Sequence, residues 1–451
     1  MHTSVVILAA GQGKRMNSDL PKVLHPVAGA ALLHHAMRSA ASLEPEHTVI
    51  VAGHGADQVK ASAEEHSPEA KTVLQDEQLG TGHAVLQARP ELQDFEGDLL
   101  VLYGDTPFIR PETLAKMAAA RATADLVVLG FNAADPGRYG RLITQGDSLD
   151  RIVEFKDASP EERAVKLCNS GVMMAKASAL FTLLDQISND NAAGEYYLTD
   201  CIALARQSGQ SAQVVICDEA ETLGVNSRLD LAAAEAAFQA RARHELLENG
   251  VTLAAPDSVY LSYDTVIGRD ATIEQNVVFG PGASVESGAL IRAFSHLEGC
   301  HVAKGAVVGP YARLRPGAEL AEAAKVGNFV EIKNAEVGEG AKINHLSYVG
   351  DAAVGAKANL GAGTITCNYD GVMKHHTEIG AGAFIGSNTM LVAPVRIGAQ
   401  AMTGSGSVIT EDVDDGDLAL ARAKQVNKKG LAIKLFDLFK KRKAKSALEN
   451  K

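Results

Sequence analysis

The sequence is poor in cysteine and in positive charge. Five cysteines occur in 451 residues, none in a C-x-x-C pair, at positions 168, 201, 217, 300 and 367. This usage offers no disulfide framework and fits a reducing compartment, so we expect a cytoplasmic protein. The 43 lysines and arginines are outnumbered by 55 acidic residues, and the formal net charge is -12. Such a balance argues against a general nucleic-acid-binding role.

Long apolar runs are also missing. No stretch reaches the length of a membrane span, so we expect a soluble protein without membrane insertion. The apolar start SVVILAA, from Ser4, is not preceded by lysine or arginine and is followed by charged sequence, unlike a secretory signal. The one basic cluster, KKRKAK from Lys440, lies in the tail and is interpreted as a solvated end. A chain of this length predicts two or three domains.

Up to about residue 228, short β-branched runs alternate with stretches of helical pattern. The runs begin at Ser4, Thr48, Asp98, Asp125 and Ala212. Strands that alternate with amphipathic helices predict βαβ units and a mainly parallel sheet. The alanine-rich stretch 229–249 contains no helix breaker and predicts one connecting helix.

From about residue 251 the chain follows a six-residue period. Interior-type residues recur from Leu261 through Ile267 and Ile273 to Ile409, and glycine often follows them. This is the pattern of a hexapeptide β-helix, in which each repeat is one short strand and a turn. Three repeats make a coil, so the span allows roughly nine coils. The period breaks once, at residues 363–380, where an inserted loop is expected to build a site.

The stretch LAAGQGKRMNSDLPKVLH, residues 8–25, places two glycines and several cations after the first predicted strand. Met16 stands where the dinucleotide fingerprint has its third glycine, so a dinucleotide does not fit. Gly11 and Gly13 let backbone N–H groups approach a phosphate, and Arg15 and Lys22 neutralise its charge. The loop therefore predicts a site for the phosphates of a nucleoside triphosphate.

The same stretch resembles the L-A-A-G-x-G-x-R-M…P-K signature of sugar-phosphate nucleotidylyltransferases. Together with the hexapeptide pattern, it makes nearly the whole chain similar to the bifunctional N-acetylglucosamine-1-phosphate uridylyltransferase/glucosamine-1-phosphate N-acetyltransferase family. The resemblance implies an α/β protein with an N-terminal Rossmann-like nucleotidylyltransferase domain over 1–228, a linker helix over 229–249 and a C-terminal left-handed parallel β-helix over 250–451 with a basic tail. It also implies a homotrimer whose acetyltransferase sites lie between neighbouring β-helices.

The activity implied by this resemblance is the synthesis of UDP-N-acetylglucosamine for cell-wall and lipopolysaccharide biosynthesis. Acetyl-CoA first acetylates glucosamine-1-phosphate, and UTP then donates its uridylyl group to N-acetylglucosamine-1-phosphate with release of pyrophosphate. UTP and acetyl-CoA are the implied co-substrates, and Mg²⁺ is the implied cofactor. Because a sugar phosphate oxygen attacks the α-phosphorus directly, the second step needs no protein nucleophile.

Asp105, in LYGD at the end of a predicted strand, lies where open α/β sheets bind ligands. The resemblance pairs it with Asn226 as the Mg²⁺ ligands, which leaves room for waters and phosphate oxygens. It assigns uracil to Gln75, Gly80 and Thr81. The full set implied for the nucleotide and its phosphates is Leu8, Ala9, Ala10, Gly11, Arg15, Lys22, Gln75, Gly80, Thr81, Tyr103, Gly104 and Asp105. The set implied for the sugar of the uridylyl site is Gly140, Glu154, Asn169 and Asn226.

His345, in NHLSYVGD, is by resemblance the general base of acetyl transfer. Histidine suits this role because an unperturbed imidazole titrates near neutrality. The resemblance gives the sugar phosphate to Arg315 and Lys333. The full substrate set implied for acetyl transfer is Arg315, Lys333, Tyr348, Asn359, Asn368 and Tyr369, and the acetyl-CoA set is Ala362, Ser387, Ser405 and Arg422.

Other interpretations fit parts of the pattern. The β-helix could be purely structural, or the chain could be a monofunctional nucleotidylyltransferase with an inert oligomerisation prism. An inert prism, however, has no reason to assemble His345, Tyr348 and Asn368. Hexapeptide β-helices also carry zinc carbonic anhydrases, and His296 and His301 could share a metal. A third histidine ligand is hard to find, since none lies between His244 and His296.

Overall fold

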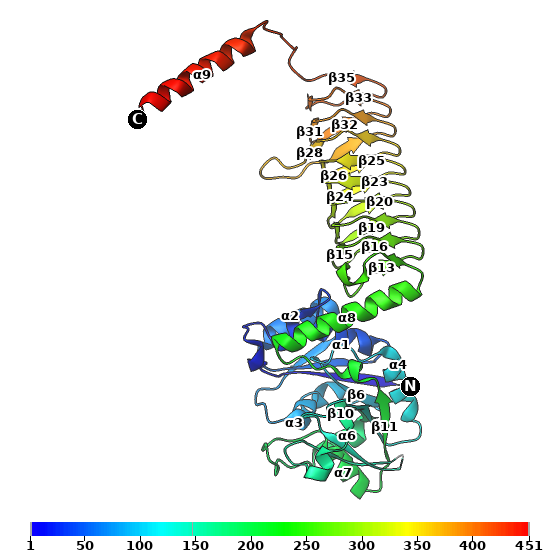
Figure 1. Cartoon of the computed structure of the whole chain (residues 1–451). Coiled ribbons are helices and arrows are strands. Elements are labelled where there is room, and N and C mark those ends of the chain that lie inside the picture. Colours follow the sequence, from blue (N-terminus) through cyan, green and yellow to red (C-terminus); the bar gives the residue numbers. More distant parts are fainter. Residues whose placement is uncertain (1, 147, 450–451) are drawn as a thin grey trace. The chain divides into compact units, whose positions relative to one another are not determined.

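The computed structural model describes residues 2–146 and 148–449. The described chain divides into two compact units. The first unit runs to Asn249 and takes in the short segments Val259–Thr265 and Phe279–Pro281, while the second holds the remaining described residues (Figure 1).

The first unit is built on a mixed β-sheet with the strand order β5-β4-β1-β6-β10-β7-β11-β9-β8. Parallel pairs join β5, β4, β1 and β6, and a further parallel pair joins β7 and β11. The five strands predicted from the sequence are thus confirmed. β10 runs antiparallel to both β6 and β7, which the sequence pattern did not indicate. The strands are β1 (Thr3–Ala9), β4 (Thr48–Ala52), β5 (Lys71–Leu74), β6 (Asp98–Tyr103), β7 (Leu126–Asn132), β8 (Arg141–Gln145), β9 (Ser148–Val153), β10 (Leu167–Lys176) and β11 (Ala212–Cys217), with a small β2 (Pro26–Val27) and β3 (Ala30–Ala31) hairpin beside them.

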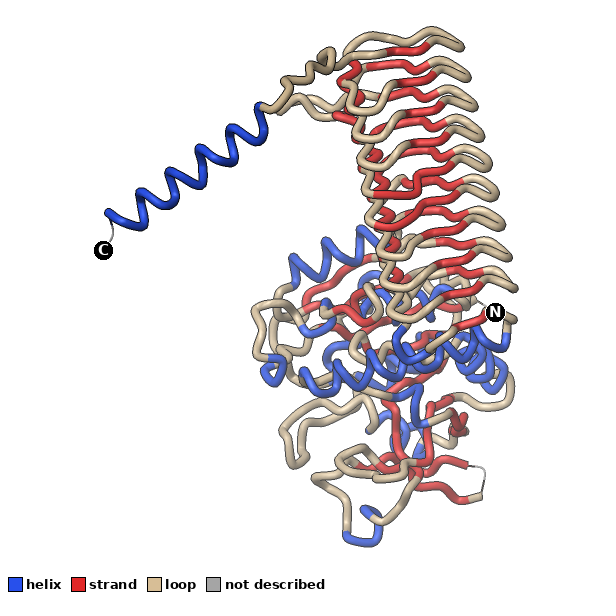
Figure 2. Tube along the Cα trace, turned by 45° about the horizontal axis from the view of Figure 1, so that its top comes forward, coloured by secondary structure: helices blue, strands red, loops and turns tan. Residues whose placement is uncertain are grey.

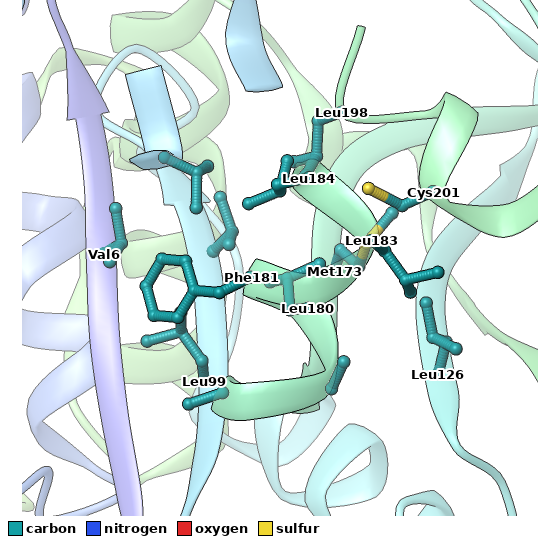
Figure 3. Close-up of a cluster of buried hydrophobic side chains, with 14 of the residues drawn as sticks. Val6, Leu99, Leu126, Met173, Leu180, Phe181, Leu183, Leu184, Leu198 and Cys201 are labelled. Atoms are coloured by element: carbon teal, nitrogen blue, oxygen red, sulfur yellow. The ribbon is translucent and has the colours of Figure 1, made fainter. Parts of the chain in front are cut away.

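Helices cover both faces of this sheet. Successive side chains of a strand point to opposite faces, so Val6 and Leu8 of β1 pack in one hydrophobic cluster and Val5 and Ile7 in another. Figure 3 shows the first cluster, in which Val6 lies near Phe181. The helices on that face are α3 (Thr81–Leu86), α6 (Ala177–Leu184) and α7 (Asp200–Gln207), and those on the other are α1 (Leu32–Ala41), α2 (Ala56–His66) and α4 (Pro111–Ala120). A short α5 (Pro160–Arg163) follows β9.

The helix predicted over 229–249 forms α8 (Arg228–Glu248). Its first turn is capped by Ser227, whose hydroxyl accepts a hydrogen bond from the backbone N–H of Asp230 at 3.2 Å. Phe238 packs in a hydrophobic cluster with Met16 of the glycine-rich loop region. The helix therefore contributes to the core of the first unit.

The second unit is a parallel β-helix of short stacked strands (Figure 2). Parallel registers such as Ile273 with Ile291 and Ile291 with Val308 place the predicted interior residues directly above one another. All three side chains are fully buried, and burial of each contributes about 1.5–3 kcal/mol. The six-residue period is confirmed. One sheet contains β12 (Thr252–Leu253), β14 (Thr272–Ile273), β17 (Leu290–Ile291), β20 (Val307–Val308), β23 (Lys325–Asn328), β25 (Lys342–His345), β27 (Asn359–Leu360), β30 (Phe384–Ile385), β33 (Met402–Thr403) and β35 (Leu418–Ala419).

The remaining strands of the β-helix pair in a second, branched sheet. They are β13 (Val266–Ile267), β15 (Val278–Phe279), β16 (Ser284–Val285), β18 (His296–Leu297), β19 (Cys300–Val302), β21 (Arg313–Leu314), β22 (Ala318–Leu320), β24 (Glu331–Val337), β26 (Tyr348–Val354), β28 (Ile365–Cys367), β29 (Thr377–Ile379), β31 (Met390–Val392), β32 (Val395–Ile397) and β34 (Val408–Ile409).

The predicted break in the period lies between β28 and β29. The chain there turns back on itself, with an antiparallel bridge between Tyr369 and Lys374 and a hydrogen bond from the backbone N–H of His375 to the carbonyl of Asn368 at 2.8 Å. After the last strand, the basic tail forms α9 (Leu431–Glu449). In the part of the chain that the structure describes, no helix is both long enough and apolar enough to cross a membrane.

One corner of the β-helix carries large side chains on successive coils, which we call the corner ridge. It consists of Phe294, Tyr311, Phe329 and Leu346, each with a positive φ between 52° and 61° and an exposure between 48% and 61%. The first two rings stack with centroids 4.9 Å apart, and the second and third with centroids 5.4 Å apart. Left-handed backbone costs such residues about 1–2 kcal/mol each. The ridge therefore combines backbone strain with exposed apolar surface.

Candidate active sites

The glycine-rich loop after β1 packs against a lysine that bridges two oxygens. Gly13 has a φ of 61°, and a Cβ there would lie 2.7 Å from the Cβ of Lys22. The Nζ of Lys22 donates hydrogen bonds to Asp105 Oδ2 and, at 3.1 Å, to Asn226 Oδ1. The Lys22 side chain is only 12% exposed. The loop thus sets the position of a largely buried cation between the two predicted metal ligands.

The oxygen pair of Asp105 and Asn226 fits Mg²⁺. Carboxylate and amide oxygens are hard ligands of the kind this ion prefers, and the ammonium of Lys22 demonstrates that both oxygens converge on one cation. Among residues 2–146 and 148–449, no group of three or more His, Cys, Asp or Glu side chains could hold a metal. A metal at this pair would therefore retain several positions for water and phosphate oxygens, as Mg²⁺ usually does.

A pocket of about 270 Å³ opens beside Lys22. A Cβ on Gly11 would meet nothing within 4 Å, so the loop backbone is open here. Gly104 does not line the pocket, but its N–H donates to the carbonyl of the lining residue Leu8 at 2.9 Å. Most of the predicted nucleotide residues are therefore brought together. The lining consists of Leu8, Ala9, Ala10, Gly11, Lys22, Val23, Gln75, Gln78, Gly80, Thr81, Ala84, Tyr103, Asp105 and Glu195.

Three of the predicted sugar residues also meet. The backbone N–H of Asn169 donates to the carbonyl of Gly140 at 2.9 Å, and a Cβ on Gly140 would lie 3.4 Å from Glu154 Oε1. Burial raises the pKa of the Glu154 carboxyl, and the hydrogen bond from Thr199, at 3.3 Å, offsets only part of that rise. The fourth predicted residue, Asn226, lies at Lys22 instead.

Arg15 lines a different pocket from Lys22. This second pocket of about 410 Å³ is formed by Arg15, Arg138, Tyr139, Gly224 and Asn226. Asn226 also accepts a hydrogen bond from Lys22, which lines the first pocket. Arg138 was not predicted, because no local pattern indicates that its loop returns to the phosphate loop.

In the second unit, the predicted base His345 ends β25 and is exposed. Its Nδ1 lies 2.7 Å from Asn328 Oδ1. Because an amide oxygen can only accept, Nδ1 carries the proton and Nε2 keeps its lone pair. Asn328 therefore fixes the tautomer in which His345 can act as a base, and it was not predicted because it lies one coil away in the sequence.

A buried carboxylate, that of Asp351, organises other polar residues of the second unit. Asp351 accepts hydrogen bonds from Asn368 Nδ2 and, at 2.7 Å, from Asn334 Nδ2. Burial alone would raise the pKa of Asp351, but these two hydrogen bonds, together with the nearby charges of Lys333 and Lys374, bring it below the usual value. Asn368 Nδ2 also reaches the Tyr348 hydroxyl at 3.5 Å. The unpredicted Asp351 thus orients Asn368, which in turn contacts Tyr348.

The predicted phosphate-binding cations gain a partner from the inserted loop. The amine of Lys374 lies beside that of Lys333, and its proximity and like charge lower the pKa of Lys333. Arg315 donates to Glu331 Oε1 at 2.8 Å. Two ammonium groups held together form a place where an anion would relieve repulsion. Lys374 could not be found from spacing, because the fold of the inserted loop brings it back to β24.

The predicted acetyl-CoA residues lie along one corner, on the coils after His345. The backbone N–H of Asn388 donates to the carbonyl of Ala362, and that of Gly406 to the carbonyl of Ser387, each at 2.8 Å. The guanidinium of Arg422 donates to the carbonyl of Ser405 at 2.5 Å. Residues Ala362, Ser387, Ser405 and Arg422 therefore form a continuous column.

Two predicted residues stand at the edge of this arrangement. Asn359 is the register partner of Lys342, three residues before His345. The Tyr369 hydroxyl donates to the carbonyl of Gly371 at 2.6 Å and is held within its own loop.

The zinc interpretation receives no support from His296 and His301. His301 Nε2 lies 3.2 Å from Glu286 Oε1, and its Nδ1 lies 2.9 Å from Ser284 Oγ. His296 lies on β18, the preceding strand in the chain, which pairs with β15 and β21 and not with β19. Both ring nitrogens of His301 are therefore engaged by protein side chains.

Comparison with known proteins covers both units. Residues 5–166 match the model of the MobA-like NTP transferase domain, and residues 376–411 match the bacterial transferase hexapeptide (six repeats). A relative from Ruegeria sp. (strain TM1040), named bifunctional protein GlmU, is 68% identical over 447 residues, which is 99% of this chain and 100% of that protein. The protein of the same name from Ruegeria pomeroyi is 66% identical, with 100% of both chains covered. The chain belongs to the GlmU family.

As a GlmU-family protein, the chain is a bifunctional transferase that synthesises UDP-N-acetylglucosamine, with a uridylyltransferase and an acetyltransferase activity. Its substrates are small molecules that include UTP and acetyl-CoA. Membership of this family removes the interpretations of the β-helix as purely structural or inert.

Proposed function

We propose that the two activities are divided between the two units, with uridylyl transfer in the first and acetyl transfer in the second. This assignment is supported by the contacts of the predicted site residues, which stay within one unit. Lys22 contacts Asp105 within the first unit, and His345 contacts Asn328 within the second.

In the first unit, the open backbone at Gly11 and the charges of Lys22 and Arg15 bind the triphosphate of UTP. Glu154 and Asn169 hold the sugar so that a phosphate oxygen of N-acetylglucosamine-1-phosphate faces the α-phosphorus. A bond forms from that oxygen to the α-phosphorus while the bond to the leaving pyrophosphate breaks. Fixed positions and charge neutralisation lower the barrier to this in-line step.

Asp105 and Asn226 would hold the magnesium ion of this site. When bound, the ion would supply further charge neutralisation at the triphosphate. Lys22 keeps the two oxygens together and remains available as a cation for the phosphates.

In the second unit, Nε2 of His345 takes a proton from the amine of glucosamine-1-phosphate. The amine nitrogen bonds to the thioester carbonyl carbon of acetyl-CoA, the carbon–sulfur bond breaks, and coenzyme A leaves as a thiolate that regains a proton. Lys333 and Lys374 bind the sugar phosphate, because a dianion between them removes their repulsion. Asn368 and Tyr348 orient the sugar, and the column from Ala362 to Arg422 carries the coenzyme.

We further infer a homotrimer in the cytoplasm. The corner ridge supports self-association, because exposed apolar surface of this kind marks interaction sites. The free energy gained by burying these side chains would offset the strain of their left-handed backbone. The cysteine usage supports a reducing compartment.

The division of activities is tested with the full-length protein by metal removal. Chelation with EDTA is expected to stop pyrophosphate release from UTP and N-acetylglucosamine-1-phosphate while acetyl transfer continues. Asp105→Ala should reproduce this separation in the presence of excess Mg²⁺. Loss of both activities, or of neither, would contradict the assignment.

A further inference from the structure

The side-chain amide of Gln75 has both of its donors engaged. Gln75 is 4% exposed and lines the nucleotide pocket. Its Nε2 donates to the carbonyl of Gly80 at 3.2 Å and lies 3.0 Å from Nδ1 of His83. A carbonyl can only accept, so the nitrogen of the amide faces Gly80. Only the side-chain oxygen of Gln75 therefore remains to accept a hydrogen bond from a molecule in the pocket.

The second contact defines the protonation of His83. Nδ1 must accept from Gln75, so the ring proton of the neutral imidazole sits on Nε2. The Nε2 of Gln87 donates to the backbone carbonyl of His83 at 3.1 Å and lies 3.2 Å from His83 Nε2. Gln87 therefore packs against the outer edge of the ring, and the acceptor role of Nδ1 follows from its contact with Gln75 alone.

We propose that His83 is a positioning residue that makes the enzyme choose uracil over cytosine, although it does not line the pocket itself. The proposal rests on the proposed function, in which Gln75 reads the nucleobase. It requires only that the locked amide oxygen faces the N3 position of the pyrimidine.

The chemistry of the two bases gives the selectivity. Uracil carries a hydrogen on N3, which the oxygen of Gln75 accepts. Cytosine has a lone pair at N3, which would face that oxygen. To donate to cytosine, the amide would have to turn, place its oxygen against the carbonyl of Gly80 and give up the contact of its nitrogen with Nδ1 of His83. Buried acceptors that face each other without a hydrogen are costly, so the lock rejects cytosine.

The test compares kcat/KM for UTP and CTP in pyrophosphate release from N-acetylglucosamine-1-phosphate. His83→Leu removes the acceptor and keeps an apolar side chain of similar bulk. His83→Asn retains an oxygen near the place of Nδ1, and Gln87→Leu removes only the outer partner. Acetyl transfer by the same preparations, assigned to the other unit, is the control for intact protein.

We expect His83→Leu to lower the UTP-to-CTP selectivity about tenfold, the scale of one buried hydrogen bond, mainly through KM. His83→Asn should retain most of the selectivity, and Gln87→Leu should lose less than His83→Leu. Equal activity loss for both nucleotides, with the selectivity ratio unchanged in all three variants, would overturn the proposal. Gln75→Leu separates this from the proposed function: if it leaves nucleotide choice unchanged, the reading of uracil by Gln75 is itself wrong. If Gln75→Leu alters nucleotide choice and His83→Leu does not, only the role of His83 fails.

Discussion

Gly13→Ala is expected to impair uridylyl transfer through Lys22 rather than through direct contact with substrate. The new Cβ would lie 2.7 Å from the Cβ of Lys22, whereas ordinary contacts begin at 3.4 Å. Lys22 must therefore retreat by about 0.7 Å, and its Nζ then loses the joint contact with Asp105 and Asn226. A displacement near 1 Å at a positioned group can cost about 10²-fold in rate. The φ of 61° adds about 1–2 kcal/mol of backbone strain.

We therefore expect kcat/KM for UTP to fall about 10²-fold, with a lower melting temperature and unchanged acetyl transfer. Pyrophosphate release, thermal unfolding and thiol release from acetyl-CoA measure the three quantities. Gly11→Ala is the matched control, since its Cβ meets nothing within 4 Å and should leave the melting temperature unchanged even where it weakens UTP binding. Uridylyl transfer by Gly13→Ala within threefold of the wild-type rate would refute the coupling of the loop to Lys22.

Three further predictions follow from the described contacts. His345→Ala should lower kcat of acetyl transfer by about 10² or more, and higher pH should partly rescue it because more of the substrate amine is deprotonated. Glu154→Gln should raise KM for the sugar phosphate about tenfold. The same variant should be more stable than the wild type, by a margin that is absent at pH 4 and grows as pH rises. The reason is that burial raises the pKa of Glu154 in the folded wild type, which therefore loses stability as pH rises above the pKa of this carboxyl in the unfolded chain. A difference in melting temperature that does not depend on pH would contradict this. Phe329→Asn, which tolerates the left-handed backbone, should weaken self-association at least tenfold in sedimentation velocity; unchanged assembly would exclude the corner ridge as a contact.

Much of the fold could be predicted because it depends on local patterns. The strands β1 and β4 are short β-branched runs and β6 is a short apolar run, and the interior of the β-helix repeats with the six-residue period of stacked coils. β10 was not predicted because its sequence, LCNSGVMMAK, mixes polar and apolar residues and its direction depends on strands far away in the chain. A register shift between Asn169 and Met173 interrupts it further.

The site residues also divide into those that local motifs indicate and those that depend on distant parts of the chain. Residues inside motifs, such as Lys22 and Asp105, could be named from the sequence. Asn328 and Lys374 could not, because each reaches its partner through the stacking of coils or the return of a loop. Asp351 was also not predicted, because its role is to orient the amides of Asn334 and Asn368, which lie on other coils.

The central claim is that one chain performs two separable reactions at two independent sites. The most direct measurement supplies glucosamine-1-phosphate, acetyl-CoA, UTP and Mg²⁺ and follows the sugar products by mass spectrometry for Asp105→Ala, His345→Ala and an equal mixture of the two. We predict that Asp105→Ala accumulates N-acetylglucosamine-1-phosphate, that His345→Ala leaves glucosamine-1-phosphate largely unconverted, and that the mixture forms UDP-N-acetylglucosamine. A variant that loses both reactions, or a mixture that forms no UDP-sugar, would contradict the claim.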